Sequence, residues 1–180
     1  MHMATNINRW TLEELHSLPD DGNKYELVRG QLFVTPPPNL EHETILARLS
    51  RILEPYVAAH DLGFVYHPRS VLRFEGSEVE PDLMVRPRPR ELRVDWDQAP
   101  VPMLVVEVFS GSTRRRDRQD KRELYAEAGV DEYWIVDPER RVITVAHLDG
   151  REETVGDTLT WSPRGAGAPL VLQVADLFAP

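Results

Sequence analysis

The sequence predicts one mixed α/β domain built around a β-sheet. Three observations support this fold class. First, a chain of 180 residues is the usual size of one domain with a substantial core. Second, the predicted elements follow the order helix, strands, helix, strands. Third, the apolar run 103–109 shows almost no alternation, as expected of a central strand that is covered on both faces. We therefore assign residues 1–180 to a single domain.

The N-terminal part predicts two helices separated by a hairpin. The first helix, residues 11–18, begins with a capping box formed by Thr11 and Glu14. Residues 25–35 predict a β-hairpin. A longer helix begins near Asn39. Its apolar side chains recur at helical spacing and predict one buried stripe: Ile45, Leu46, Leu49, Ile52, Leu53, Tyr56 and Val57.

The rest of the chain is richer in strands. In chain order, it predicts short strands at 63–66, 70–74 and 81–85, a surface loop at 87–102, the central strand at 103–109, a helix at 116–128 that ends at Gly129, a hairpin at 133–145 and a strand at 158–161. The hairpin 133–145 is apolar, and we consider it as the interface of a homodimer.

Composition excludes several classes of protein. Cysteine is absent, which excludes disulfides and thiolate-bound zinc. No apolar run reaches the roughly 18 residues that a membrane span needs, and the N-terminus lacks a signal-peptide pattern. We therefore expect a cytoplasmic protein without a membrane contact. The formal charge of −9 argues against a passive nucleic-acid coat.

Two acids in apolar strands are candidates for metal ligands. Asp82 follows Pro81 at the start of a strand, and Glu107 lies within the central strand. A lone buried carboxylate is costly unless it is paired or bound to a cation. Neighbouring strands lie about 4.8 Å apart, so acids at matched heights could share one Mg²⁺. The alternatives are a turn-forming Asp82 and a Glu107 that points outward or pairs with an arginine.

Lysine is scarce in this chain, which contains two lysines and nineteen arginines. Unlike arginine, lysine can be shifted toward neutrality and handle protons. Lys121 shares one face of the helix that follows Glu107 with Asp117 and Tyr125. It could reach the end of the sheet and activate water or hold a phosphate oxygen. The alternative is a surface ion pair between Asp117 and Lys121.

Further residues could complete a site for phosphate esters. Glu26 lies in the first hairpin and by alternation could face inward. His42, in the first turn of the helix near Asn39, could contact a phosphate. A basic cluster follows the central strand and could neutralise phosphates; it includes Arg114, Arg115 and Arg118. The alternatives are a solvent-facing Glu26, a packed or exposed His42 and a solvated charge run.

These residues occur in an order that resembles the Uma-type restriction endonuclease family, a branch of the PD-(D/E)XK nuclease superfamily. The resemblance covers about residues 25–148. It rests on the segments Tyr25–Leu32, Pro36–Pro38 with His42, Pro81–Leu83, Val105–Val108 and Ser110–Thr113, on Asp117, Lys121 and Tyr125, and on Ala128–Val130 and Glu132–Asp137.

The resemblance implies a restriction-endonuclease-like core, in which helices flank a central mixed β-sheet. It implies Mg²⁺-dependent hydrolysis of DNA, with Mn²⁺ as a substitute metal. Asp82 and Glu107 would be the metal ligands, and Glu26 an additional acid from outside the core strands. The superfamily lysine should follow Glu107 by two residues, where this chain has Phe109; Lys121 would replace it.

Two other functions are compatible with the sequence. The acidic total charge and the missing lysine after Glu107 suit an interaction protein that keeps the nuclease fold without activity. A metal-dependent phosphohydrolase acting on small phosphate esters would use the same acids.

Overall fold

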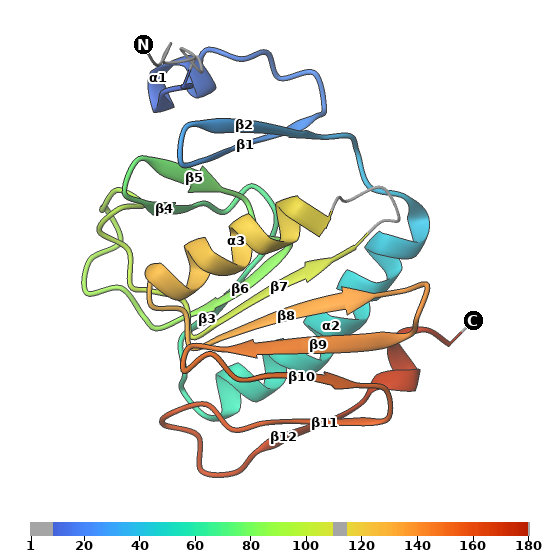
Figure 1. Cartoon of the computed structure of the whole chain (residues 1–180). Helices are drawn as coiled ribbons and strands as arrows, with labels where there is room; N and C mark the ends of the chain where they lie inside the picture. The colour runs from blue at the N-terminus through green and yellow to red at the C-terminus, as the bar shows by residue number, and fades with distance from the viewer. Residues whose placement is uncertain (1–8, 110–114, 180) are drawn as a thin grey trace.

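The computed structural model describes residues 9–109 and 115–179, except for the side chains of residues 115–118. Figure 1 shows the order of the elements. The helices are α1 (Leu12–His16), α2 (Leu40–Ala59), α3 (Arg115–Glu127) and the 3-10 helix η1 (Val174–Leu177). The strands are β1 (Lys24–Val28), β2 (Gln31–Thr35), β3 (Phe64–Tyr66), β4 (Leu72–Phe74), β5 (Ser77–Val79), β6 (Leu83–Arg86), β7 (Leu104–Val108), β8 (Glu132–Asp137), β9 (Val142–His147), β10 (Glu152–Val155), β11 (Thr158–Trp161) and β12 (Leu170–Gln173).

The described strands form three sheets rather than the one that the sequence predicts. The central sheet has the order β10-β9-β8-β7-β6-β3. Its strands β7 and β8 are parallel, and its other neighbours are antiparallel. A parallel pair needs a crossover connection, which α3 supplies here. The other sheets are β2-β1-β5-β4 and the pair β11-β12.

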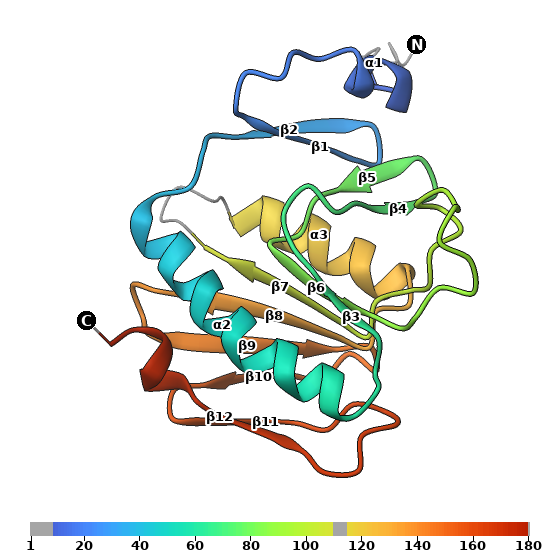
Figure 2. The ribbon, with the colours of Figure 1, turned by 180° about the vertical axis from the view of Figure 1, so that it is seen from behind.

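One helix covers each face of the central sheet. In Figure 1 α3 crosses the face nearer the viewer, and Figure 2 shows α2 across the opposite face. Leu104, Val106 and Val108 pack into the core on the α2 side, and Val105 packs into the core on the α3 side with Tyr125. Successive side chains of a strand point to opposite faces. Glu107 therefore faces α3.

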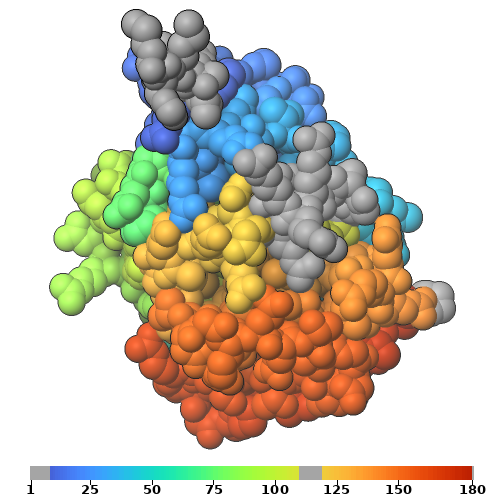
Figure 3. Space-filling model, viewed as in Figure 1, coloured from blue at the N-terminus to red at the C-terminus, as the bar shows by residue number. Residues whose placement is uncertain are grey.

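The four-stranded sheet lies over one end of the central sheet, between it and α1 (Figure 1). Figure 3 shows the same order on one face, with the blue N-terminal residues above the yellow α3 and the orange C-terminal strands below it. Strand β5 in this sheet was not predicted. It follows a tight turn in which Glu75 and Gly76 have φ of 46° and 76°, and it is only three residues long.

Several local predictions are confirmed. Thr11 caps α1, and the capping box with Glu14 is present. Asn39 caps α2 by accepting a hydrogen bond from the backbone N–H of His42. After α3, Gly129 adopts a φ of 83°, which suits its predicted role at the helix end. Strands β10 and β12 were not predicted as separate elements.

The hairpin 133–145 cannot serve as the dimer interface that the sequence suggested. Its strands β8 and β9 lie inside the central sheet between β7 and β10. Their apolar side chains are buried within the chain itself, including Trp134, Ile135 and Ile143. A homodimer stays a prediction, and its interface would have to lie elsewhere. No helix in the described part of the chain is long and apolar enough to cross a membrane.

Candidate active site

The structure brings together three of the predicted site residues from three different elements. Glu26 comes from β1, Glu107 from β7 and Lys121 from α3. The Lys121 ammonium donates to Oε1 of Glu26 at 2.9 Å and to Oε1 of Glu107 at 2.9 Å. It also lies 2.8 Å from Oε2 of Glu26. All three side chains are buried, so the Asp117–Lys121 surface ion pair is not the role of this lysine.

Two tyrosines hold the carboxylate of Glu107. The hydroxyl of Tyr125, one helical turn after Lys121, donates to Oε1 of Glu107 at 2.5 Å. The hydroxyl of Tyr133, on the neighbouring strand β8, lies 3.4 Å from Oε2. The two rings pack edge to face with their centroids 4.8 Å apart. The orientation of Glu107 is thus fixed from two sides.

Asp82 lies beside Glu107 at the end of the central sheet. Leu83 pairs with Val106 in the antiparallel register of β6 and β7, so the residues just beyond this pair are Asp82 and Glu107. The backbone N–H of Val108 donates to Oδ2 of Asp82 at 2.8 Å. The Asp82 side chain is 9% exposed, and it interacts with α2 on the other face of the sheet. Nε2 of His42 lies 3.0 Å from Oδ2.

Lys24 is a site residue that the sequence analysis missed. Its ammonium donates to the backbone carbonyl of Glu80 at 3.1 Å and lies 3.4 Å from Oδ1 of Asp82. The backbone N–H of Glu80 in turn donates to Oε1 of Glu26 at 2.9 Å. Residue 80 therefore connects the surroundings of Asp82 to the Glu26–Lys121 pair. Both lysines of the chain lie at this site, and the scarcity of lysine was the signal that could have identified Lys24.

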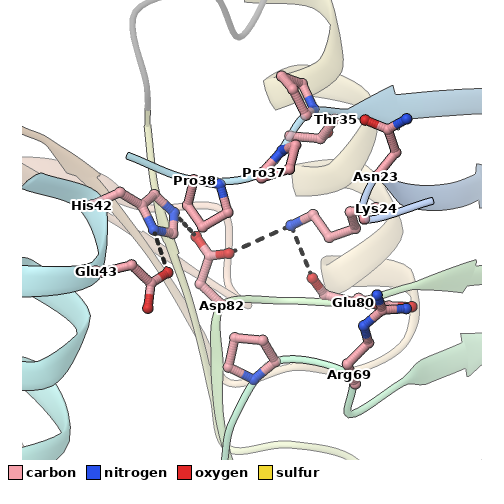
Figure 4. Close-up of a pocket in the computed structure, with 13 residues that line it drawn as sticks. Asn23, Lys24, Thr35, Pro37, Pro38, His42, Glu43, Arg69, Glu80 and Asp82 are labelled. Atoms are coloured by element: carbon pink, nitrogen blue, oxygen red, sulfur yellow. Dashed lines mark hydrogen bonds and ion pairs between the residues drawn. The ribbon is translucent and has the colours of Figure 1, made fainter. Parts of the chain in front are cut away.

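A pocket of about 260 Å³ opens beside Asp82 (Figure 4). Lys24, His42 and Asp82 point toward one another at its wall, and prolines from the segment after β2 form another side. The residues that line it are Gly22, Asn23, Lys24, Thr35, Pro36, Pro37, Pro38, His42, Glu43, Pro68, Arg69, Glu80 and Asp82. Glu26, Glu107 and Lys121 are not among these lining residues; they lie deeper in the protein.

Electrostatics keep Asp82 ionised. Burial raises the pKa of this carboxyl, but the hydrogen bond from His42, the charge of Lys24 and the amide of Val108 outweigh burial and hold the pKa at about 2. Burial lowers the pKa of His42, and the carboxylate of Asp82 more than offsets this, so the imidazole pKa lies above its ordinary value. An ionised Asp82 accepts hydrogen bonds only, so Nε2–H of His42 donates.

Both lysines are charged rather than neutral, which corrects the expectation that led to Lys121. Burial lowers the pKa of Lys121, but the charges of Glu107 and Glu26 reverse the effect and raise it well above the ordinary value. Burial also lowers the pKa of Lys24, and the carboxylates of Glu26 and Asp82 raise it more. At neutral pH neither amine can accept a proton from water. Lys121 is instead a fixed cation between two glutamates.

The residues predicted to contact nucleic acid differ in what the structure shows of them. His42 lines the pocket, but its Nε2 binds Asp82, and its Nδ1 lies 3.5 Å from Oε1 of Glu43. Arg115 and Arg118 lie in α3, and their side chains fall outside the structural description. Arg114 lies outside the described residues altogether.

The donor set at the end of the sheet suits a hard divalent cation. Among the described residues, no group of three or more histidine or acidic side chains is arranged to hold a metal ion. Mg²⁺ is commonly bound by one or two carboxylates and keeps several waters. Asp82 and Glu107, which the register of β6 and β7 brings to neighbouring positions, are the two acids that could supply such a pair. Their oxygens already accept hydrogen bonds from Val108, His42 and Tyr125, which orient the two carboxylates.

Comparison with known protein families assigns the chain to a family. The family model Uma2, described as "Putative restriction endonuclease", matches residues 12–174. The chain belongs to the Uma2 family. Both networks described above, around Lys121 and around Asp82, lie within the matched residues. The resemblance inferred from the sequence is thereby confirmed.

Solved structures support the same fold. The crystal structure of a putative nuclease belonging to DUF820 from Anabaena variabilis matches with a TM-score of 0.79 and 20% sequence identity, over 93% of this chain and 97% of that chain. At this identity the likeness shows the fold, and it confirms the predicted nuclease-like mixed α/β class. A search of curated proteins finds no match.

Proposed function

We propose that this Uma2 chain is a Mg²⁺-dependent endonuclease that hydrolyses DNA phosphodiester bonds, with Mn²⁺ as a substitute metal. The observation that carries the proposal is the buried cluster of Glu26, Glu107 and Lys121 beside Asp82. Three acids and a lysine converge on one end of the sheet from segments far apart in sequence. Membership of a family described as restriction endonucleases supports nuclease chemistry.

Asp82 and Glu107 are the residues that would hold the metal, with the Val108 carbonyl as a third donor. When bound there, Mg²⁺ would polarise a phosphodiester oxygen and lower the pKa of a coordinated water. The hydrogen bonds from Val108 and Tyr125 hold the two carboxylates in place before metal or substrate arrives. Such orientation of ligating groups by their outer partners tunes metal sites in general.

The other residues of the site would each have a separate role. Lys121 keeps Glu26 and Glu107 together, and its charge offsets theirs. Because Lys121 is protonated, this amine cannot take a proton from water, and Glu26, which is buried behind the pocket, would support the site through Lys121 and the backbone of Glu80. His42 holds Oδ2 of Asp82 from the α2 side. The pocket beside Asp82 is where the DNA phosphate would enter.

A plasmid-nicking assay with Mg²⁺ or Mn²⁺ tests this function. Wild type should nick supercoiled DNA, and Asp82→Ala and Lys121→Ala should abolish nicking. Arg88→Met is the matched control, because it removes an exposed arginine that pairs with Asp61 away from the site. Cleavage that persists unchanged in both site variants would eliminate the site. Turnover of small phosphate esters with no action on DNA would favour the phosphohydrolase alternative instead.

A further inference from the structure

The two lysines at the site occupy very different environments. Lys121 is surrounded by Glu26 and Glu107, which accept its hydrogen bonds at 2.9 Å. Its side chain is 9% exposed, and it does not line the pocket. It forms hydrogen bonds with both glutamates, and it also lies 2.8 Å from the second carboxylate oxygen of Glu26 as an ion pair. Buried between two carboxylates and away from the pocket, this lysine is not placed to meet a substrate.

Lys24 faces the pocket instead. Its side chain is 23% exposed, and Figure 4 shows its amine between Asp82 and Glu80 at the pocket wall. Two donors are directed at the Glu80 carbonyl and, over a long 3.4 Å, at Oδ1 of Asp82. Among the described residues these are its hydrogen-bond partners, so one donor remains for a ligand in the pocket.

The position of Lys24 is fixed by the strand that carries it. It is the first residue of β1 and pairs with Thr35, the last residue of β2. Glu26, two residues later on β1, is anchored by Lys121 and by the backbone of Glu80. Alternation along a strand places residues 24 and 26 on the same side. The buried Lys121 network thus holds the strand that presents Lys24 to the pocket.

We propose that Lys24 is the lysine of this site that contacts the substrate, donating a hydrogen bond to a non-bridging oxygen of the phosphodiester bound beside Asp82, while Lys121 is a positioning residue. This inference rests on the proposed nuclease function. A phosphate oxygen would take the remaining donor of Lys24 and compete for the long contact with Asp82. A cation fixed before the reaction is well placed to stabilise charge that develops on the phosphate.

The scarcity of lysine permits a direct test by NMR. Protein labelled with ¹⁵N-lysine has two side-chain ammonium groups, and Lys24→Arg assigns their signals. The metal-free protein, with EDTA present to prevent cleavage, is titrated with an eight-nucleotide single strand and with its duplex. The Lys24 signal should shift on binding, and the Lys121 signal should stay. A Lys24 signal that stays fixed at saturation, a shift of Lys121 alone, or an absence of binding overturns the proposal.

Cleavage kinetics with Mg²⁺ give the second measurement. Lys24→Met should lower kcat about 100-fold with little change in KM, the usual cost of losing one transition-state donor. Lys24→Arg, which keeps the charge, should recover at least tenfold of that loss. Arg151→Met controls for the lost charge, since Arg151 pairs with Asp149 on the exposed surface, and should match wild type. A fully active Lys24→Met overturns the proposal.

The two measurements separate this inference from the proposed function. If wild-type protein cleaves no DNA while the Lys24 signal still moves on binding, the nuclease proposal fails and the phosphate contact stands. If wild type cleaves DNA and the Lys24 variants are unaffected, the nuclease proposal stands and Lys24 has no part in it. Melting temperatures of both Lys24 variants, compared with wild type, show whether lost activity reflects lost folding.

Discussion

The backbone N–H of Val108 donates a 2.8 Å hydrogen bond to Oδ2 of Asp82, so the first acid of the site is held by the strand that carries the second. This bond joins the end of β7 to the residue before β6. It orients Asp82 without using any substrate or metal. Protonation of Asp82 should therefore affect the folding stability of the protein as well as the chemistry of the site.

Acid should destabilise the protein partly through Asp82. Its pKa is about 2 in the folded state against 3.8 as the ordinary value, so the folded protein binds this proton less readily. The stabilisation is present above pH 4 and is lost as the pH falls toward 2, by about 2 kcal/mol. The free energy of unfolding, measured with urea across this range, should change by about 2 kcal/mol less in Asp82→Asn than in wild type. An equal pH dependence of stability in the two proteins would contradict the lowered pKa of Asp82 in the folded state.

Lys121→Met should be strongly destabilising. It leaves Glu26 and Glu107 buried without their shared cation, and breaking a buried pair in this way costs about 3–5 kcal/mol. Arg88→Met is the matched control, because its partner Asp61 is exposed and surface pairs contribute about 0–1 kcal/mol. Urea denaturation of wild type, Lys121→Met and Arg88→Met measures the loss of stability in each variant. A loss for Lys121→Met no larger than for the control would show that the carboxylates are solvated or protonated.

Gly63→Ala should destabilise the edge of the central sheet by about 3 kcal/mol or more. Gly63 has a φ of 127°, and an added Cβ would lie 2.0 Å from the backbone carbonyl oxygen of Arg86. The control is Gly150→Ala, at a φ of 88° with no described atom within 4 Å of the added Cβ. It should cost about 1–2 kcal/mol, from backbone strain alone. Thermal unfolding gives the comparison, and equal losses would contradict the predicted clash.

Much of the fold could be predicted because its signals are local. Thr11 and Glu14 encode a helix start within four residues, and the stripe from Ile45 to Val57 encodes one buried face of α2. The unbroken apolar run around Glu107 indicated a strand covered on both sides, as β7 is. Strand β5 carried no comparable signal, since three residues are too few to establish a period.

The site was predictable only where its residues lie in such elements. Asp82 and Glu107 stand in or beside apolar strands, and the helical spacing of Lys121 and Tyr125 placed both on one face. Lys24 has no such context, because its role arises from the packing of the four-stranded sheet over the central one. Tyr133 was taken as a hairpin residue, and its contact with Glu107 depends on the parallel pairing of β7 with β8. Tertiary contacts of this kind leave no periodic trace in the sequence.

Tyr125→Phe should lower both stability and activity, because its hydroxyl donates a buried 2.5 Å hydrogen bond to Glu107. Losing a bond to a charged acceptor costs about 1.5–3 kcal/mol, and a Glu107 held less firmly should reduce cleavage roughly 10–100-fold, as for other partners of metal ligands. Tyr25→Phe is the control: its hydroxyl donates to Asp21 at 2.8 Å on the exposed surface, so it should change neither quantity appreciably. Urea unfolding and plasmid nicking test both variants. Wild-type nicking by Tyr125→Phe would show that Glu107 is oriented without this tyrosine.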